Sequence, residues 1–364
     1  MKKILLLIAA VIAVSGCVGI PDVFGRDVIS VQQSIVESGV RDVIVVRDIV
    51  TIPKSPLLPD QQVILSFVIE NRDALKSARA YVDLFNAPTM RDGFDRPCNF
   101  YAVSGYTPNT IGIGTPVPVV GPSGQVAQNT DRFCLPDQCG PAGCVVLPGE
   151  EKPINFGMKT PTQEDIKNIK TQTRLDFKTT YNFDGSLNYI VPAVNADEIT
   201  KRQRAGEKTN LFTTKSFGSG PVIVDVELQG APYILDTYEA VMMFKIKNRG
   251  SGTLERSQID SSSLQILFPP EFDVITAKSS EKFVCSPDPL TGGTICVNNA
   301  KKDNQDLGTI PLYRDESRSS LRFTVQLRQP MAEPFRSYPI SAQVSYKYEL
   351  RNSVDLTINP FNNF

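Results

Sequence analysis

The sequence predicts an all-β protein built as two tandem β-sandwiches, each with a disulfide-bearing insertion. Three observations predict this fold class: apolar and polar residues alternate along many short stretches, one half of the chain repeats in the other, and the cysteines are divided between the halves. Alternation with a period of two is typical of half-buried antiparallel strands. Several such strands with turn signals between them favour a sandwich over a parallel sheet.

The alternating stretches are clearest in three places. Residues 63–69, 80–84 and 323–327 each place apolar side chains on one face and more polar ones on the other. Asp184-Gly185 predicts a two-residue hairpin turn between strands at 175–183 and 187–191, because a type I′ turn needs positive φ at both central positions. Helix is expected only at 162–169, opened by a Thr-x-x-Asp capping pattern, and at 197–204.

The second half of the chain repeats landmarks of the first half in the same order. A strand ending in Phe-x-Ile-x-Asn occurs at 67–72 and again at 244–249. Because the landmarks keep their order, we expect a duplicated domain. The other matched pairs are 43–52 with 222–228, 154–161 with 321–330, and Tyr181-Asn182-Phe183 with Tyr346-Lys347-Tyr348.

The repeat suggests where the domains begin and end. We expect a first sandwich at 39–194 with a cysteine-rich insertion at 98–144, and a second sandwich at 221–361. The polar stretch 195–220, which ends in Gly218-Ser219-Gly220, is expected to be a linker.

The first residues have the layout of a secretory signal, with two lysines, an apolar run at 4–14 and small residues before Cys17. The run is too short for a transmembrane helix, which needs about 20 apolar residues. Residues 14–17 resemble the prokaryotic lipobox, which implies removal of residues 1–16, lipid attachment to Cys17 and a position at the extracytoplasmic face of the cell membrane. We expect 17–38 to form a stalk or leading strand next to the membrane, which would be one partner of the protein.

The chain has seven cysteines. Assigning Cys17 to lipid leaves an even number, and in an exported protein this indicates three disulfides. Cys285 and Cys296 flank a turn-rich stretch and are expected to pair. Three pairings stay open for the other four, and a four-thiolate zinc site is the alternative for the same residues; these four are Cys98, Cys134, Cys139 and Cys144.

A resemblance to a known class of modules can be stated from these residues. The strands ending in Phe-x-Ile-x-Asn, the turn at Leu147-Pro148-Gly149-Glu150 and the late Tyr-x-aromatic motifs resemble the CARDB-like and related immunoglobulin-like modules of archaeal and bacterial surface proteins. The second half has Leu307-Gly308-Thr309-Ile310 in place of the Leu-Pro-Gly-Glu turn. The resemblance implies immunoglobulin-like sandwiches that serve adhesion, presentation or assembly.

The composition argues against several kinds of chemistry. The chain has no histidine, which excludes histidine-based nucleophilic, general-base and zinc sites, and no nucleotide-binding motif is present. We therefore expect no enzymatic activity, no metal and no cofactor. A net charge of −1 and a pI near 5.8 also argue against nucleic acid as a partner.

The segment from Cys98 to Cys144 is the candidate binding surface, because long loops on a rigid sandwich often carry function. Its aromatic residues are Phe100, Tyr101, Tyr106 and Phe133. The alternative is a segment that covers its own sheet. We expect a structural or adhesive protein that binds other cell-surface or envelope proteins, with an accessory or ligand-binding subunit of a transport or secretion machine as the alternative.

Overall fold

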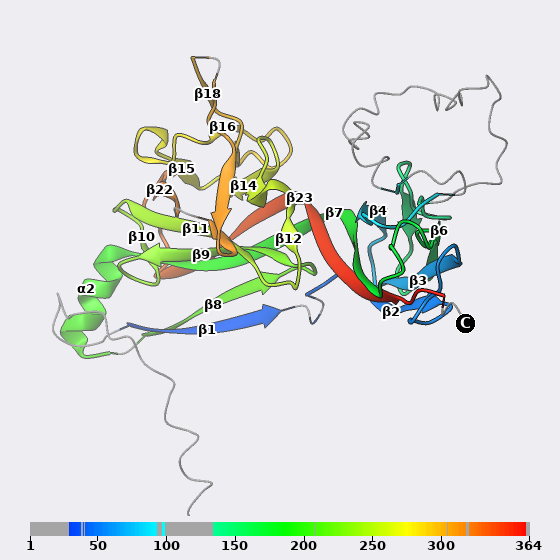
Figure 1. The fold of residues 1–364 in the computed structure, drawn as a ribbon. Helices are drawn as coiled ribbons and strands as arrows, with labels where there is room; N and C mark the ends of the chain where they lie inside the picture. Colours follow the sequence, from blue (N-terminus) through cyan, green and yellow to red (C-terminus); the bar gives the residue numbers. More distant parts are fainter. Residues whose placement is uncertain are drawn as a thin grey trace, which may run out of the picture.

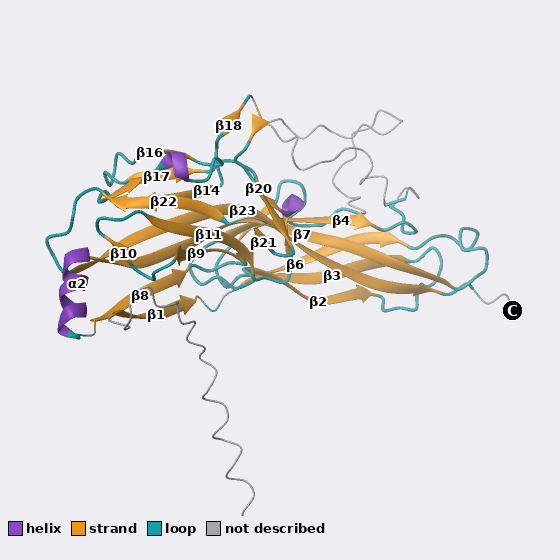
Figure 2. Cartoon of the chain, turned by 90° about the vertical axis from the view of Figure 1, so that its left-hand side faces the viewer, coloured by secondary structure: helices purple, strands orange, loops and turns teal. Residues whose placement is uncertain are grey.

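The computed structural model describes residues 29–37, 39, 41–92, 97–98, 134–207, 209–303, 305–317 and 320–361. Within these ranges strands predominate and one α-helix is present, so the predicted all-β fold class is confirmed. Figure 2 shows an elongated molecule, with the helix α2 at one end and the C-terminus at the other. The strands run mainly along its length (Figure 1).

The first lobe is the part that contains the C-terminus. One of its sheets has three antiparallel strands, β2 (Ile44–Ile52), β3 (Gln62–Asn71) and β6 (Glu151–Lys159), with β3 in the centre. Its other sheet contains β4 (Ala78–Asn86), β5 (Cys144–Val146) and parts of β7 (Thr171–Val194) and β23 (Phe335–Ile358). The two sheets face each other, since Phe67 of β3 stacks on Phe177 of β7 with 4.3 Å between ring centroids.

The second lobe is also formed by two facing sheets. Phe244 of one sheet meets Phe268 of the other edge to face, with 6.3 Å between centroids. The first sheet comprises β9 (Val222–Gln229), β11 (Ala240–Asn248), β13 (Gln258–Ile259), β15 (Phe272–Val274), β20 (Ile310–Tyr313), β21 (Glu316–Ser317) and β22 (Leu321–Leu327). The second comprises β1 (Ile29–Glu37), β8 (Thr209–Phe217), β14 (Leu264–Phe268), β16 (Val284–Pro287), β17 (Thr294–Val297) and the remaining parts of β7 and β23.

Short elements complete the second lobe. They are β10 (Ile234–Leu235), β12 (Thr253–Leu254), the hairpin of β18 (Lys301–Lys302) and β19 (Gln305–Asp306), and the 3₁₀ turns η2 (Glu255–Ser257) and η3 (Thr276–Lys278).

The two lobes share the strands β7 and β23. Each strand has 24 residues, and they pair antiparallel from Thr171↔Ile358 to Val194↔Phe335 without a break. At about 3.3 Å per residue, these strands are about 80 Å long. They pass from one lobe into the other (Figure 1), so a single sheet extends through both.

The predicted hairpin at Asp184-Gly185 is therefore wrong, because both residues lie inside β7. Gly185 is required for another reason. A Cβ at this position would lie 2.5 Å from the backbone oxygen of Val222, where β9 begins. Glycine permits this close approach of two backbones within a strand.

Residues 195–220 do not form the expected linker. They contain α2 (Ala196–Ala205), close to the helix expected at 197–204, and β8, which pairs with both β7 and β1. Asn195 caps the helix by accepting hydrogen bonds from two backbone N–H groups. The polar composition of this stretch was misleading, because every second residue of β8 from Leu211 to Phe217 is buried.

The stalk expected at 17–38 also differs in its described part. Residues 29–37 form β1, which pairs in parallel with β8 at the edge of the second lobe. Among the described residues, the chain therefore passes first through the second lobe, as β1, and then enters the first lobe at β2.

The internal repeat appears in equivalent places of the two lobes. Asn71 ends β3 and Asn248 ends β11, the central strand between β9 and β22. Each side-chain oxygen accepts the backbone N–H two residues later, at 3.0 Å for Asn71 and 3.1 Å for Asn248. Nδ2 of Asn71 donates to two backbone carbonyls, and Nδ2 of Asn248 donates to one backbone carbonyl and to the Asp315 carboxylate. The motif ends the strand and turns the chain in the same way twice.

Candidate functional site: the disulfide-closed edge of the first lobe

The cysteine-rich segment leaves the first lobe and returns to it at one point. Cys98 and Cys134 form a disulfide, with 5.4 Å between their Cα atoms although they are 36 positions apart. Both residues are buried. The disulfide closes the base of the segment, whose residues 99–133 lie outside the described ranges.

Backbone hydrogen bonds attach both ends of the segment to the same region. The N–H of Cys98 donates to Met90 O at 2.8 Å, and the N–H of Cys134 donates to Gly157 O of β6 at 2.7 Å. Arg91 and Lys159 exchange two backbone hydrogen bonds of 2.9 Å, which tie residue 91 to the end of β6. The base of the segment therefore covers the open edge of the three-stranded sheet, where unpaired backbone groups would otherwise be exposed.

A side-chain clip strengthens this edge. Asp137 accepts hydrogen bonds from the backbone N–H and the amide Nδ2 of Asn155, both at 2.8 Å. The N–H of Asp137 in turn donates to Asn155 O at 3.0 Å. Because Asn155 lies on β6, the clip continues the ladder of that strand past Cys134.

A second disulfide, Cys139–Cys144, closes a tight loop that leads into β5. The carbonyl of Cys139 accepts a hydrogen bond of 2.7 Å from the N–H of Val82 on β4. Gly143 has φ of +67° and lies directly against the Tyr81 ring, so a side chain there would clash with the ring. The loop thus joins the segment to the second sheet of the lobe.

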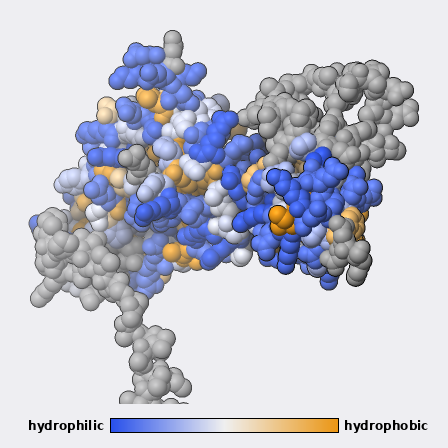
Figure 3. All heavy atoms as spheres, in the orientation of Figure 1, coloured by the Kyte–Doolittle hydropathy of each residue, from blue (hydrophilic) through white to orange (hydrophobic). Residues whose placement is uncertain are grey.

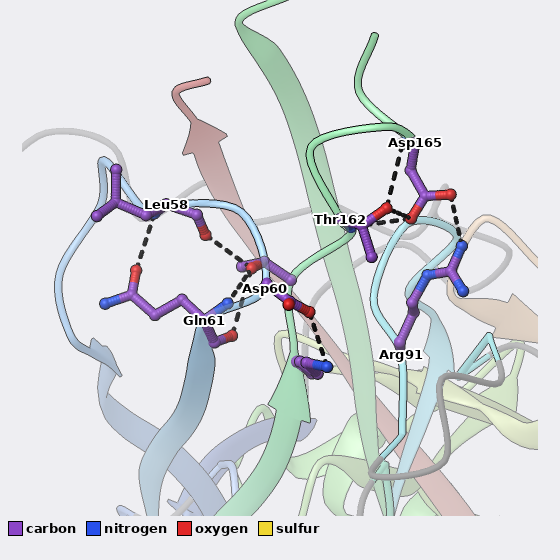
Figure 4. Close-up of polar contacts among 8 residues, drawn as sticks. Leu58, Asp60, Gln61, Arg91, Thr162 and Asp165 are labelled. Carbon is purple, nitrogen blue, oxygen red and sulfur yellow. Dashed lines mark hydrogen bonds and ion pairs between the residues drawn. The ribbon is translucent and has the colours of Figure 1, made fainter. Parts of the chain in front are cut away.

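The turn at 160–170 supports the same end of the lobe. The Arg91 guanidinium donates to Asp165 at 2.7 Å, and Asp165 also accepts from the hydroxyl and the N–H of Thr162 (Figure 4). The Thr162 hydrogen bonds, together with Arg91, hold the pKa of Asp165 below its ordinary value.

The predicted capping pattern therefore forms, but the helix expected at 162–169 does not. Lys167 and Asn168 adopt left-handed backbone conformations that stop the helix after one turn. The stretch consists of successive turns instead.

The loop before β3 is held by a short polar network beside this turn (Figure 4). Gln61 accepts from the N–H of Leu58 at 2.8 Å, and the Thr160 hydroxyl donates to Leu58 O at 2.7 Å. Asp60 pairs with Lys159 at 2.7 Å. These contacts leave the Leu58 side chain exposed at the tip.

The structure places some of the predicted site residues and not others. The six cysteines of the two halves form Cys98–Cys134, Cys139–Cys144 and Cys285–Cys296, which selects one of the three open pairings and leaves no four-thiolate cluster. The lipidation residue and the four aromatic residues lie outside the described ranges; they are Cys17, Phe100, Tyr101, Tyr106 and Phe133.

Two polar pairs at this edge were not identified from the sequence. In the pair Arg91–Asp165, the sequence indicates Asp165 but not Arg91, because the Thr-x-x-Asp pattern marks Asp165 as a partner of Thr162. Asp137–Asn155 has no sequence signal, since it joins residues 18 positions apart on different sides of a turn.

The described side chains favour a rigid scaffold. No group of three metal-ligating side chains was found among the described residues. No helix in the described part of the chain is long and apolar enough to cross a membrane. What the edge provides is a fixed base, made of two disulfides and several backbone hydrogen bonds, for the segment between Cys98 and Cys134.

Comparisons with known proteins give no family. No family model matches the chain, and no curated protein matches it. Among solved structures, the C-terminal domain of the AgI/II polypeptide BspA of Streptococcus agalactiae is similar at 8% identity, covering 83% of this chain and 92% of that one, with a TM-score of 0.15. The B domain of a biofilm associated protein is similar at 7% identity, covering 86% and 75%, with a TM-score of 0.15. Similarities this slight carry no statement about function.

Proposed function

We propose that this protein is an exported lipoprotein, anchored through Cys17 to the extracytoplasmic face of the cell membrane, that acts as a structural or adhesive protein. It would bind other surface or envelope proteins rather than catalyse a reaction. The observation that carries the proposal is the state of the cysteines. Six of the seven are paired in three disulfides, and the remaining one is the cysteine of the lipobox-like motif.

Disulfides of this number support an oxidising compartment, since thiols are kept reduced in the cytosol. A lipid on Cys17 would then keep the exported chain at the membrane, because two acyl chains bind a bilayer stably and one does so only marginally. The absence of histidine from the whole sequence supports a binding role over catalysis.

The fold supports an orientation for the anchored molecule. Residues 18–28 separate Cys17 from Ile29, the first residue of β1, and this stretch spans at most about 40 Å when extended. Ile29 pairs with Thr209, just after α2, so the α2 end of the second lobe would lie near the membrane. The long strands would then place the far end of the first lobe about 80 Å further out. The cysteine-rich segment would be presented on this outer lobe.

The anchor is tested by substituting the lipidated cysteine. Cells expressing the wild type, Cys17→Ala and the matched control Ser15→Ala are separated into membrane and soluble fractions. We expect the wild type and Ser15→Ala in the membrane fraction and Cys17→Ala in the soluble exported fraction. Continued sedimentation of Cys17→Ala with membranes would refute the lipid anchor.

The partner is tested by cross-linking on intact cells. A photoreactive residue is placed at position 138 or 141, beside the base of the segment, and a control is placed at the exposed position 313 on β20 of the second lobe. Recovery of a surface or envelope protein at the first two positions only supports the structural or adhesive role. Recovery of a transporter or secretion complex would make this protein an accessory subunit of that machine.

A further inference from the structure

One face of the large sheet in the second lobe differs from the rest of the molecule. Along β23, Tyr338, Ile340 and Ala342 point into the core, so the residues between them point outward. Those outward residues, Ser337, Pro339, Ser341 and Gln343, carry no charge.

The neighbouring strands show the same property. On β7 the outward residues of this lobe include Asn188 and Ile190, which pair with Ser341 and Pro339. On β8 they are Phe212, Thr214 and Ser216, and β1 continues the face with Gln32, Ser34 and Val36.

The other side of β23 extends the face further. On β14, Gln265 and Leu267 point outward, and they pair with Val297 and Ile295 of β17. On the last strand, β16, Val284 pairs with Val297. We call this outward surface, from β1 to β16, the neutral face. No residue named on it is charged, although 21% of the chain is charged.

The first lobe supplies an internal comparison, because the same two strands continue into it. There the outward residues of β7 include Arg174, Asp176 and Lys178, and those of β23 include Arg351 and Asp355. The change from charged to neutral occurs within one strand and one sheet. The absence of charge is therefore specific to the second lobe, and it is not a general property of β7 and β23.

The neutral face has the size of a protein interface. Four of its strands contribute about nine residues each, and β14, β16 and β17 contribute five, four and four. At about 4.8 Å between strands and 3.3 Å per residue they cover about 800 Å², which matches the roughly 800 Å² that each partner contributes to a standard interface. It exposes apolar side chains among the polar ones: Phe212 is 64% exposed, Val36 55% and Val284 51%. Cavities of about 500 and 390 Å³ occur elsewhere in the described part, and no residue named on the neutral face lines them.

We propose that the neutral face binds a second copy of this chain, so that two second lobes pack sheet against sheet. A two-fold axis brings residues near it against their own copies, and charged residues there would repel each other. A face without charge avoids this cost over its whole area. A small ligand would require a concave site, and a polyanion would require basic side chains.

The direction of the two-fold axis follows from the proposed membrane anchor, and this part of the inference depends on it. An axis parallel to β23 keeps both α2 ends, and hence both anchors, on the same side. Sheets packed in this way lie about 10 Å apart with their strands nearly aligned. The two first lobes would then project side by side from one membrane.

Two matched charge variants test the face. Ile190→Lys with Gln343→Lys places lysines on the neutral face of β7 and β23, while Gln172→Lys with Ser353→Lys places them on exposed positions of the same strands in the first lobe. Each is made in the soluble Cys17→Ala protein, checked for folding by circular dichroism, and studied by sedimentation equilibrium. We expect the parent and the first-lobe variant to dimerise, and the neutral-face variant to bind at least about tenfold more weakly. A monomeric parent at all concentrations, or equal weakening in both variants, would overturn the proposal.

Cross-linking of introduced cysteines on cells, with a bis-maleimide reagent that spans the roughly 10 Å between packed sheets, tests the axis in the anchored chain. β23 is the central strand of the seven, so full overlap of the two faces places the axis over it. Ser337→Cys and Gln343→Cys should then each cross-link to their own copy, because an axis that runs along β23 brings every outward residue of that strand near its equivalent. Ser353→Cys is the control on the first lobe. Cross-linking at only one of the two positions would contradict this axis. Dimers in solution without any cross-linking on cells would contradict the arrangement in the anchored chain, while the neutral face would still be the dimer interface.

Discussion

At the residue scale, the centre of the molecule depends on a group of buried aromatic side chains. Tyr181 and Tyr348 lie opposite each other on β7 and β23, with 5.5 Å between ring centroids, and Phe183 and Tyr346 follow at 6.4 Å. All four are buried where the lobes meet. The Tyr348 hydroxyl donates to Asn248 at 2.9 Å and accepts from the N–H of Gly252 at 2.9 Å. The repeated Tyr-x-aromatic motif thus joins the two halves of the molecule.

These tyrosines predict how stability depends on alkaline pH. Burial raises the pKa of Tyr181, Tyr346 and Tyr348 well above the ordinary value of 10.0. Folding therefore favours the protonated phenols, and this contribution is fully present below pH 10 and is lost as pH rises further. We expect the free energy of unfolding to fall above about pH 10, with tyrosinate absorbance of these residues appearing only on unfolding.

Tyr346→Phe should make that fall less steep, since one buried phenol is removed. Tyr313→Phe, at an exposed position, is the control and should leave the slope unchanged. Urea unfolding followed between pH 8 and pH 11 measures both. Equal slopes for the two variants would show that Tyr346 does not titrate differently in the folded and unfolded states.

At the element scale, local patterns predicted the strands and helix well where burial on one face decides the structure. The alternating stretches at 63–69, 80–84 and 323–327 lie in β3, β4 and β22, and the polar helix near 197–204 is α2. The errors arise where a local signal was overruled by contacts distant in sequence. Asp184-Gly185 has the composition of a turn, but pairing with β23 holds it extended.

The candidate site also combines features that local sequence predicts with features that depend on contacts distant in sequence. The cysteines that close the edge of the first lobe could be identified from composition and spacing alone. Their pairing could not, because it depends on how β4 and β6 bring Cys139 and Cys134 to different sheets. The Asp137–Asn155 clip was unpredictable for the same reason.

The role of Gly185 gives a prediction for this element. Gly185→Ala should lower the free energy of unfolding by about 1 to 3 kcal/mol, because its Cβ would be forced against the backbone of β9. Gly157→Ala is the matched control: Gly157 also lies in a strand, but a Cβ there has no atom within 4 Å. It should be neutral or slightly stabilising, through the entropy of the unfolded chain. Similar effects for the two variants in urea unfolding would contradict the close approach.

At the scale of the whole molecule, the shared strands make the two lobes one structural unit. Most of the buried apolar residues form one continuous cluster that includes Leu65 and Phe177 in the first lobe and Phe244 and Phe323 in the second. A small separate cluster at the α2 end comprises Val194, Ile199 and Leu211. The ladder between β7 and β23 runs through both lobes. Unfolding of either lobe would therefore release one part of these two strands while the other part stayed in the remaining lobe. A single unit of this kind is consistent with the proposed membrane anchor, because a flexible linker between sandwiches would let the outer lobe bend back.

Hydrogen exchange along β7 and β23 tests the shared strands most directly. Backbone amides of 171–194 and 335–358 are followed in the native protein by mass spectrometry with short overlapping peptides. If the strands are continuous, the amides around Asp184 and Gly185 will exchange as slowly as those near Phe177 and Tyr189, and β8 will be protected as well. Rapid exchange at 184–185 and throughout 195–220 would show a turn and a linker there, and would mean that the two lobes are separate domains.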